Sequence, residues 1–524
     1  MQGQAVGQSR GERVTVVAAL LAASVLLSRV LGLVRDRVLA HQIGATAATD
    51  AYGAAFLVPD ILNYFLAGGA LSIAFIPLYT RVRADAGAAA AGALFGRVLG
   101  TVSVLAIAAT AVLWWQAEPL VLRAFPRFAP ETQALTVRLT RIVLPAQVFF
   151  VAGGIVRAVL MAEGRFASQA LAPLVYNLGI IAGGAWLGGA LGAEVFAWGA
   201  LAGAAVGPFA ISFVELWRRT DVRLHLKFSP FHRDVLRYLG LAAPLMLGVT
   251  LLTVDEWYDK IFGGLLAEGT VASLGYARRL MQVPVAVVGQ AIATAALPAL
   301  SRLWSEGRRE ELDRGVLDAL RAGLGLAVLA AAAFTVFAEP IVALIIQTGR
   351  FTAADTARVA TLLGIFAWAV PAWITQQIAV RAFYARGQMW RPMLLGTAVA
   401  LAAIPLYLVL GRRFGGEGLA VAGVIGMSVN ALLTLGLARV LHGGPSLLRL
   451  AATGARAALV GVAAAAGGAW AMPGGQGAVG ALLDLAVGGT VFTIVAIPGA
   501  WLLGDQAMRE ALHRMLRRLR TGSG

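Results

Sequence analysis

Arginines occur inside long apolar stretches of this 524-residue sequence, where a charged side chain is costly. Arg29 lies within the apolar run 14–34, and Arg279 lies within the run 270–300. An ionisable residue in a membrane span costs at least about 2.5–3.5 kcal/mol on insertion scales, so it normally faces a cavity or a partner. Arginine keeps its charge at any relevant pH and presents a fork that matches phosphate oxygens. The two arginines therefore predict a hydrated cavity for an anionic substrate such as a diphosphate.

A second group of charges within an apolar run is acidic. The run 235–262 contains Asp255 and Asp259, which are four residues apart. Carboxylates in a span can bind a cation or titrate, so both are candidates for a coupling-ion or proton site. A purely structural interpretation is also open, in which Asp259 pairs with Lys260 or Arg279.

Other charges lie close to the ends of the apolar runs, and these also have two interpretations. Arg35, Arg37 and Arg381 are close enough to expected span ends for their side chains to reach lipid phosphates. Asp36 can simply neutralise Arg35, and Asp50 lies at the beginning of the next apolar run. Alternatively, these groups line the same anion-binding cavity.

The elements that position these side chains must be membrane spans. Hydrophobic residues make up 59% of the chain and charged residues only 13%, against about 25% charged in soluble domains. The mean hydropathy is +0.78. This composition predicts an integral membrane protein and excludes a cytosolic enzyme, a nucleic-acid-binding module and a disordered scaffold.

The remaining composition narrows the chemistry further. The net charge of +16 arises from 43 Lys and Arg against 27 Asp and Glu. In a membrane protein this excess indicates basic cytoplasmic loops, and no nucleic-acid partner is expected. The chain has no cysteine, which excludes disulfides and thiolate ligands. None of its five histidines lies in an H-E-x-x-H pattern, so metal-assisted hydrolysis has no support.

Fourteen apolar runs are long enough to span a bilayer, which needs about 20 residues. They lie near 14–34, 48–79, 90–116, 134–161, 168–190, 193–217, 235–262, 270–300, 315–346, 355–384, 391–411, 417–441, 451–472 and 477–504. Internal prolines at Pro59 and Pro284 predict that two of the longer runs are bent. The distribution of Lys and Arg between alternate loops predicts that both termini are cytoplasmic.

An internal repeat indicates how the spans are grouped. The sequence FIPLYTR at 75–81 is echoed by ALPALSR at 296–302, which begins 221 residues later. A second echo joins 157–164 to 381–387 at an offset of about 223 residues. Two echoes at nearly one offset predict two parallel six-helix bundles, an arrangement typical of alternating-access transporters. The expected divisions are 1–230 and 231–445 for the bundles, 446–505 for two additional helices and 506–524 for a basic amphipathic tail.

Several of these motifs together resemble the MurJ (MviN) flippase family of the MOP superfamily. The resemblance extends from about residue 20 to residue 440. It rests on Ser28-Arg29-Val30-Leu31-Gly32, Arg35-Asp36, Gly44, Thr49-Asp50-Ala51, Ala55-Phe56, Pro59, Ala74-Phe75-Ile76-Pro77, YARRLMQVP at 276–284, Gly349-Arg350-Phe351 and RAFYA at 381–385.

The resemblance implies an all-α membrane protein of two six-helix bundles plus two helices that line a groove for a lipid tail. It further implies a flippase for lipid II, the undecaprenyl-diphosphate-linked peptidoglycan precursor, in the bacterial cytoplasmic (inner) membrane. The resemblance implies no enzyme activity and no cofactor. It does imply that transport is coupled to sodium ion, to a proton or to the membrane potential. Membrane lipids and cell-wall synthesis proteins are the expected partners.

The resemblance also implies which residues bind the substrate. The essential cavity arginines of the family fall on Arg29, Arg35 and Arg279, and their acidic partner falls on Asp50. Asp259 falls where some members place a cation-binding carboxylate. The complete expected substrate-binding set is Arg29, Arg35, Asp36, Asp50, Asn63 and Arg279, with Asp255 and Asp259 as the expected coupling-ion residues.

Departures from the family pattern leave alternative functions open. Asn63-Tyr64 and Gly68-Gly69-Ala70 replace the usual arginine and glutamate of the second helix, and Gln282 replaces a glutamate that some members carry. These changes favour, as the first alternative, a flippase for another polyprenyl-diphosphate-linked glycan. The second alternative is a cation or drug antiporter of the same superfamily. A polytopic glycosyltransferase is disfavoured because the expected outside loops offer only isolated acids.

Overall fold

The computed structural model describes residues 2–66, 70–222, 224–247, 251–510 and 513. Within these ranges every regular element is a helix, and two short π-helical segments interrupt the α-helices. This follows from the composition, because a bilayer offers backbone groups no water and an α-helix satisfies its own N–H and C=O groups. The all-α fold class expected from the sequence is confirmed.

The described helices account for the apolar runs of the sequence. Seven stretches of helix, some made of consecutive labelled helices, are long and apolar enough to cross a membrane. The number is eight if α17 (Ala353–Ala367) and α18 (Val370–Ala385), which are bent by 42°, count as one span. In the described part of the chain, each of the fourteen predicted runs falls mostly on helix. The count of fourteen spans stays a prediction, because length and composition alone identify fewer.

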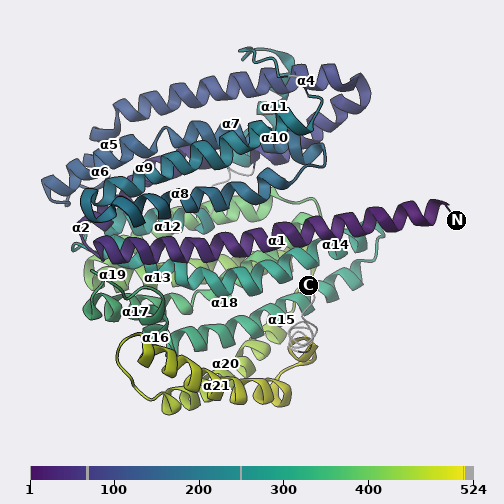
Figure 1. The fold of residues 1–524 in the computed structure, drawn as a ribbon. Coiled ribbons are helices and arrows are strands. Elements are labelled where there is room, and N and C mark those ends of the chain that lie inside the picture. Colours follow the sequence, from purple (N-terminus) through teal and green to yellow (C-terminus); the bar gives the residue numbers. More distant parts are fainter. Residues whose placement is uncertain (1, 67–69, 223, 248–250, 511–512, 514–524) are drawn as a thin grey trace. The chain divides into compact units, whose positions relative to one another are not determined.

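The chain divides into two compact units, Met1–Leu247 and Gly248–Gly524. In unit 1, α1 packs along α8, and the two helices run side by side in Figure 1. The core of unit 1 lies between α4, α7 and α11, where Phe75, Tyr79 and Tyr238 are fully buried. The helices of unit 1 are α1 (Gln2–Ile43), α2 (Ala47–Ala55), α3 (Leu57–Leu66), α4 (Ala70–Trp115), α5 (Ala117–Ala124), α6 (Pro130–Val143), α7 (Ala146–Ala162), α8 (Ala167–Leu191), α9 (Ala193–Ala204), η1 (Ala205–Ile211), α10 (Ser212–Arg219) and α11 (Arg233–Leu247).

Breaks in the helices of unit 1 arise from particular residues. Gly87 has φ +80° within α4, a left-handed conformation that glycine adopts without steric cost, and it divides α4 into two arms. The predicted bend near Pro59 is a break at Phe56, between α2 and α3. Pro59 itself lies in the first turn of α3, where its missing N–H leaves no hydrogen bond unmade.

Unit 2 contains α12 (Leu251–Gly263), α13 (Thr270–Pro284), η2 (Val285–Gln290), α14 (Ala291–Ser305), α15 (Arg309–Val336), α16 (Ala338–Ile345), α17, α18, α19 (Trp390–His442), α20 (Leu447–Ala471) and α21 (Gly477–Leu503). Gly415, with φ +59°, breaks α19 into two arms as Gly87 breaks α4. The predicted bend at Pro284 coincides with the end of α13 and the start of the π-helical segment.

The two C-terminal helices are part of unit 2. The α20–α21 pair packs against α15, and Figure 1 draws the two helices side by side. A polar cluster secures the end of α21: Arg321 Nε on α15 lies 3.0 Å from Asp505 Oδ2, which also accepts a hydrogen bond from Thr453 Oγ1 on α20. Met508 is fully buried beside this cluster.

The expected divisions stay a prediction, although the boundary between the compact units lies at a different residue. The first bundle was expected to end at 230, whereas unit 1 continues to Leu247 because α11 packs against α4. Phe75 and Tyr238, whose ring centroids are 5.8 Å apart, belong to this contact. Of the expected amphipathic tail at 506–524, the described residues are 506–510 and 513, and the rest lies outside the described residues.

Candidate functional site

Arg29 is a half-buried charge on an otherwise apolar part of α1. The same helix exposes Leu26 and Val30, each with 54% of its surface accessible. Within the described part of the chain, Arg29 forms no ion pair or hydrogen bond with another side chain. A guanidinium on an apolar helix without a protein partner is suited to bind an anion.

Arg35, almost two turns further along α1, is held by two neighbours. Its Nε and Nη2 lie 3.2 and 3.1 Å from Asp36 Oδ1, so Asp36 does neutralise Arg35. Arg35 Nη1 lies 3.3 Å from Asn177 Oδ1 on α8. Asn177 Nδ2 in turn donates to Pro173 O at 3.0 Å and to Ser28 Oγ at 3.3 Å. Asn177 therefore fixes the guanidinium of Arg35, and no pattern in the sequence indicated this residue.

Asp50 and Asn63 follow on α2 and α3 of the same unit. Asp50 lies in the first turn of α2 and is 1% exposed. A helix N-terminus favours a carboxylate because its free N–H groups carry partial positive charge. The chain enters α2 through a turn in which Gly44 has φ +67° and its carbonyl accepts from Thr49 Oγ1 at 2.6 Å. Asn63 is half-buried, and its Oδ1 atom accepts no hydrogen bond from the described residues.

The acidic residues of unit 2 enclose an arginine. Arg278 on α13 lies between Asp255 and Asp259 on α12, with its Nε 2.6 Å from Asp259 Oδ2. Its Nη1 donates to Asp255 Oδ2, and Asp255 Oδ1 accepts from the hydroxyl of Tyr407 on α19. The guanidinium also lies over the ring of Phe366 on α17, 4.6 Å from the centroid. We call these residues, Asp255, Asp259, Arg278 and Tyr407, the α12–α13 cluster.

Charge and burial define what the α12–α13 cluster can do. The side chains of Arg278 and Asp255 are each 3% exposed, and that of Asp259 is 5% exposed. With both carboxylates ionised, the two negative charges exceed the single positive charge by one. Asp259 Oδ1 is buried without a hydrogen-bond partner in the described part of the chain. Such a group is costly unless it is paired, so the cluster can accept one further positive charge.

The sequence indicated only part of this arrangement. A four-residue spacing places Asp255 and Asp259 on one face of α12, which is why both meet the same neighbour. The structure gives Asp259 a partner, Arg278, that the sequence did not single out for it. Glu256, also on α12, pairs with Lys260 at 3.3 Å. Arg279 is half-buried on α13 and belongs to unit 2, whereas Arg29 and Arg35 belong to unit 1.

Two other arginines of the apolar runs have local structural contacts. Arg157 Nη1 on α7 donates to Pro208 O at 2.9 Å, within the π-helical turn of η1. Pro208 O also accepts a hydrogen bond from Ser212 Oγ at 2.7 Å, so Arg157 connects α7 to this carbonyl of η1. Arg381 on α18 lies 5.7 Å from the ring centroid of Tyr384. In the ranges that the structure describes, no group of three or more His, Cys, Asp or Glu side chains is arranged to hold a metal ion.

The sequence model of the lipid II flippase MurJ family matches residues 39–476. The chain belongs to this family. The match includes Asp50, Asn63 and Arg279, together with the α12–α13 cluster, and begins just after Arg29 and Arg35.

Individual MurJ family members are similar over most of the chain. A probable lipid II flippase MurJ from Bdellovibrio bacteriovorus is 28% identical over 439 residues, which cover 81% of this chain and 82% of the relative. The lipid II flippase MurJ of Burkholderia cenocepacia is 29% identical over 417 residues, which cover 78% of this chain and 80% of the relative.

Solved structures agree on the fold. A lipid II flippase MurJ in an inward closed conformation has a TM-score of 0.78 at 21% identity, covering 93% of this chain and all of that chain. An inward-facing multidrug resistance MATE transporter of the MOP superfamily has a TM-score of 0.68 at 17% identity, over 81% of this chain and 95% of that chain. The helical fold expected from the sequence is thus that of MurJ and MATE transporters.

Proposed function

We propose that this chain is a flippase that moves lipid II from the inner to the outer leaflet of the bacterial cytoplasmic membrane by alternating access. The observation that carries the proposal is the family match over residues 39–476. The multi-pass helical fold supports it, because a membrane-embedded carrier is what the transport of a lipid-linked sugar needs. The chain is a transporter. The proposed function neither makes nor breaks a covalent bond.

The arginines of α1 and α13 would bind the diphosphate of the substrate. A diphosphate headgroup that crosses bare hydrocarbon loses its hydration, at a cost of many kcal/mol. Arg29, which has no partner among the described residues, and Arg35, which Asn177 orients, would bind diphosphate oxygens during the transport cycle. Arg279 would do so from unit 2. Asp36, Asp50 and Asn63 are proposed to orient these arginines or to contact the sugar headgroup.

The α12–α13 cluster is the proposed coupling site. The guanidinium of Arg278 already occupies the space between Asp255 and Asp259, so a sodium ion would have to displace it. A proton needs no such space and can bind Asp259 Oδ1, which has no hydrogen-bond partner in the described ranges. Coupling to a proton is therefore favoured over sodium, and a contribution of the membrane potential is the remaining alternative. The other charges near this site are Glu256 and Lys260 on α12 and Arg279 on α13.

A second candidate substrate is another polyprenyl-diphosphate-linked glycan. Asn63 stands where the family usually carries an arginine, and its buried Oδ1 accepts no hydrogen bond from the part of the chain that the structure describes. A headgroup with a hydroxyl or amide at that position would satisfy this oxygen, whereas an extra phosphate would not. The inner membrane with both termini cytoplasmic is the proposed location, with membrane lipids and cell-wall synthesis proteins as partners.

Complementation of a cell depleted of its own lipid II flippase tests the proposed function. The wild-type chain is expected to restore growth, and the variants Arg29→Ala and Arg279→Ala are expected to fail at equal membrane abundance. Arg81→Gln, which removes a positive charge from an exposed position on α4, is the matched control and is expected to restore growth. Failure of the well-expressed wild-type chain would count against lipid II, and rescue by all variants would refute the roles of the arginines.

A further inference from the structure

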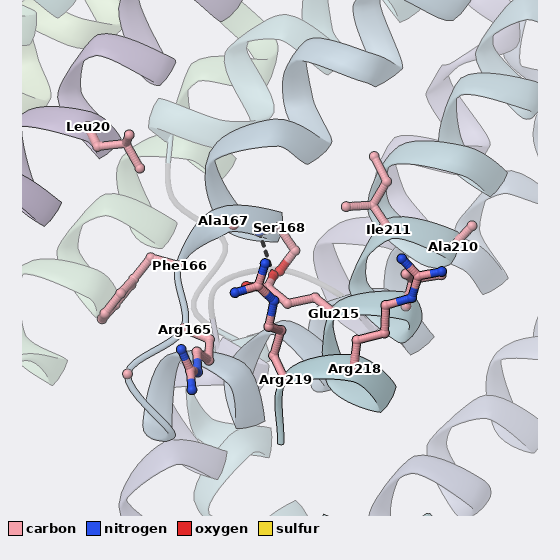
Figure 2. A pocket seen from close by; sticks show the side chains of 12 residues that line it. Leu20, Arg165, Phe166, Ala167, Ser168, Ala210, Ile211, Glu215, Arg218 and Arg219 are labelled. Atoms are coloured by element: carbon pink, nitrogen blue, oxygen red, sulfur yellow. Dashed lines mark hydrogen bonds between the residues drawn. The ribbon is translucent and has the colours of Figure 1, made fainter. Parts of the chain in front are cut away.

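Unit 1 contains a cavity of about 630 Å³ whose lining includes none of the arginines of the proposed transport site. It is formed by the turn before α8, the start of α8, the end of η1, α10 and one residue of α1 (Figure 2). We call it the α8–α10 pocket. Its lining consists of Leu20, Gly164, Arg165, Phe166, Ala167, Ser168, Ala210, Ile211, Val214, Glu215, Arg218 and Arg219.

One part of the α8–α10 pocket is apolar and faces outward. Leu20 on α1 is 50% exposed and Val214 on α10 is 46% exposed. Phe166 and Ile211, which also line the pocket, are half-buried. Apolar side chains that are exposed on a membrane protein face lipid, so this wall is suited to contact an acyl chain.

The other part of the pocket is positively charged. The backbone N–H of Ser168 donates to Glu215 Oε2 at 2.7 Å, and Figure 2 shows the side chain of Arg219 extending toward this pair. Arg165 lies in the turn before α8, whereas Arg218 extends toward Ala210 in the same view. Three arginines against one carboxylate leave an excess of two positive charges, so an anion is the expected ligand.

A buried hydroxyl in the lining has no partner of its own. Ser168 is fully buried, and its Oγ atom forms no hydrogen bond within the described residues. A buried hydroxyl is normally hydrogen-bonded, and an unmade bond there costs about 1–3 kcal/mol. The Oγ atom is closed off from the pocket, so rotation of the Ser168 side chain would have to bring the hydroxyl to a ligand oxygen there.

Neighbouring ion pairs place the pocket at the end of the spans. Arg83 on α4 pairs with Glu163 at 2.9 Å and with Asp221 at 3.2 Å. Glu163 precedes the pocket turn, and Asp221 follows the span that ends at Arg219. The charged part of the pocket therefore lies at the level where lipid headgroups meet water, with the apolar part toward the hydrocarbon.

We propose that the α8–α10 pocket binds an anionic phospholipid of the adjoining leaflet. Its phosphate would contact the exposed guanidinium groups of Arg165 and Arg219, and one acyl chain would lie along Leu20 and Val214. A basic pocket between helices at a membrane surface is the arrangement that recognises lipid phosphates. The lipid phosphate is favoured over free phosphate because most of the lining is apolar. A lipid bound here would contact both α1 and α10.

Lipid binding to the full-length protein in nanodiscs tests this proposal. The nanodiscs contain phosphatidylcholine with a small fraction of photo-crosslinkable phosphatidylglycerol, and crosslinked peptides are identified by mass spectrometry. Labelling is expected at the turn before α8 and in α10. The variant Arg165→Gln/Arg219→Gln is expected to reduce this labelling about twenty-fivefold, because each arginine near a headgroup contributes roughly fivefold.

Two further variants separate a specific site from general attraction to charge. Arg81→Gln removes a positive charge two residues from Arg83, at the same end of unit 1, and is expected to label like the wild-type chain. Ala167→Trp fills the exposed mouth of the pocket and is expected to abolish labelling without removing a charge.

The outcomes that would overturn the proposal are equally defined. Unchanged labelling in the double arginine variant, or an equal loss in Arg81→Gln, would show that no specific site exists. Displacement of the lipid by millimolar inorganic phosphate would show that the pocket binds the phosphate alone. None of these readouts depends on transport, so they test the pocket independently of the proposed flippase function.

Discussion

Replacing Arg278 with glutamine is predicted to destabilise the protein strongly, although the residue is not expected to contact the substrate. The substitution leaves the carboxylates of Asp255 and Asp259 buried without the guanidinium that lies between them. Removing one partner of a buried ion pair costs about 3–5 kcal/mol, because the remaining charge stays desolvated. Two stranded carboxylates place the expected loss at the upper part of that range.

The same reasoning predicts a rescue. In the triple variant Asp255→Asn/Asp259→Asn/Arg278→Gln all three buried charges are removed, and Tyr407 can still donate to the new amide oxygen. Replacing a complete buried ion cluster with neutral groups is often neutral in stability. The triple variant is therefore expected to recover most of the stability that Arg278→Gln alone loses.

Denaturant unfolding in detergent, followed by fluorescence of the 12 tryptophans, measures these differences. Arg302→Gln is the matched control, because Arg302 is 73% exposed and pairs with Glu306 at 3.0 Å on the surface. Exposed pairs contribute little to stability, so this variant is expected to unfold like the wild-type chain. Wild-type stability of Arg278→Gln, or a triple variant less stable than the single one, would refute the reasoning.

Three further predictions follow from other parts of the structure. Asn177→Ala is expected to lower transport with little loss of folding, because the substitution removes the side chain that holds the guanidinium of Arg35. Complementation at equal membrane abundance measures the loss, and full activity of the variant would contradict the prediction. Gly415→Ala is expected to destabilise the protein by about 1–2 kcal/mol, because alanine adopts a φ of +59° only with strain. Gly436→Ala is the control, because the space around this α19 position is open, and it is expected not to destabilise the protein. Comparison of the denaturant midpoints of the two variants with that of the wild-type chain tests both expectations. Burial alone would raise the pKa of Asp505, but hydrogen bonds from two neighbouring groups and a nearby guanidinium lower it below its usual value. Its contribution to stability is therefore present above the unfolded pKa of about 3.9 and is lost as pH falls through the lower folded value. Asp505→Asn is expected to lack this part of the pH dependence, and an unaltered stability profile between about pH 2 and 5 would contradict the assignment.

Apolar composition made the helical fold predictable, because only helices satisfy the backbone along runs of this length. The long helices and the bends near Pro59 and Pro284 follow from local sequence alone. The division at Leu247 could not be predicted from local sequence, because it depends on the packing of Tyr238 against Phe75, and these two residues are far apart in the sequence.

The candidate site was predictable to a smaller extent. Charges within apolar runs were visible in the sequence, and so was the spacing that puts Asp255 and Asp259 on one face. Their pairing with Arg278 was not, because Arg278 and Arg279 are adjacent and only the rotation of α13 decides which one meets α12. Asn177 carried no signal, since a single amide in an apolar helix has many possible roles.

Translocation of lipid II by the purified chain in proteoliposomes tests the central claim most directly. The assay follows the fraction of a labelled headgroup that becomes accessible to an impermeant reagent outside the vesicle. The wild-type chain and Arg81→Gln are predicted to expose lipid II, and Arg29→Ala and Arg279→Ala are predicted not to. Absence of translocation by a folded wild-type chain, or equal rates in all four proteins, would contradict the claim.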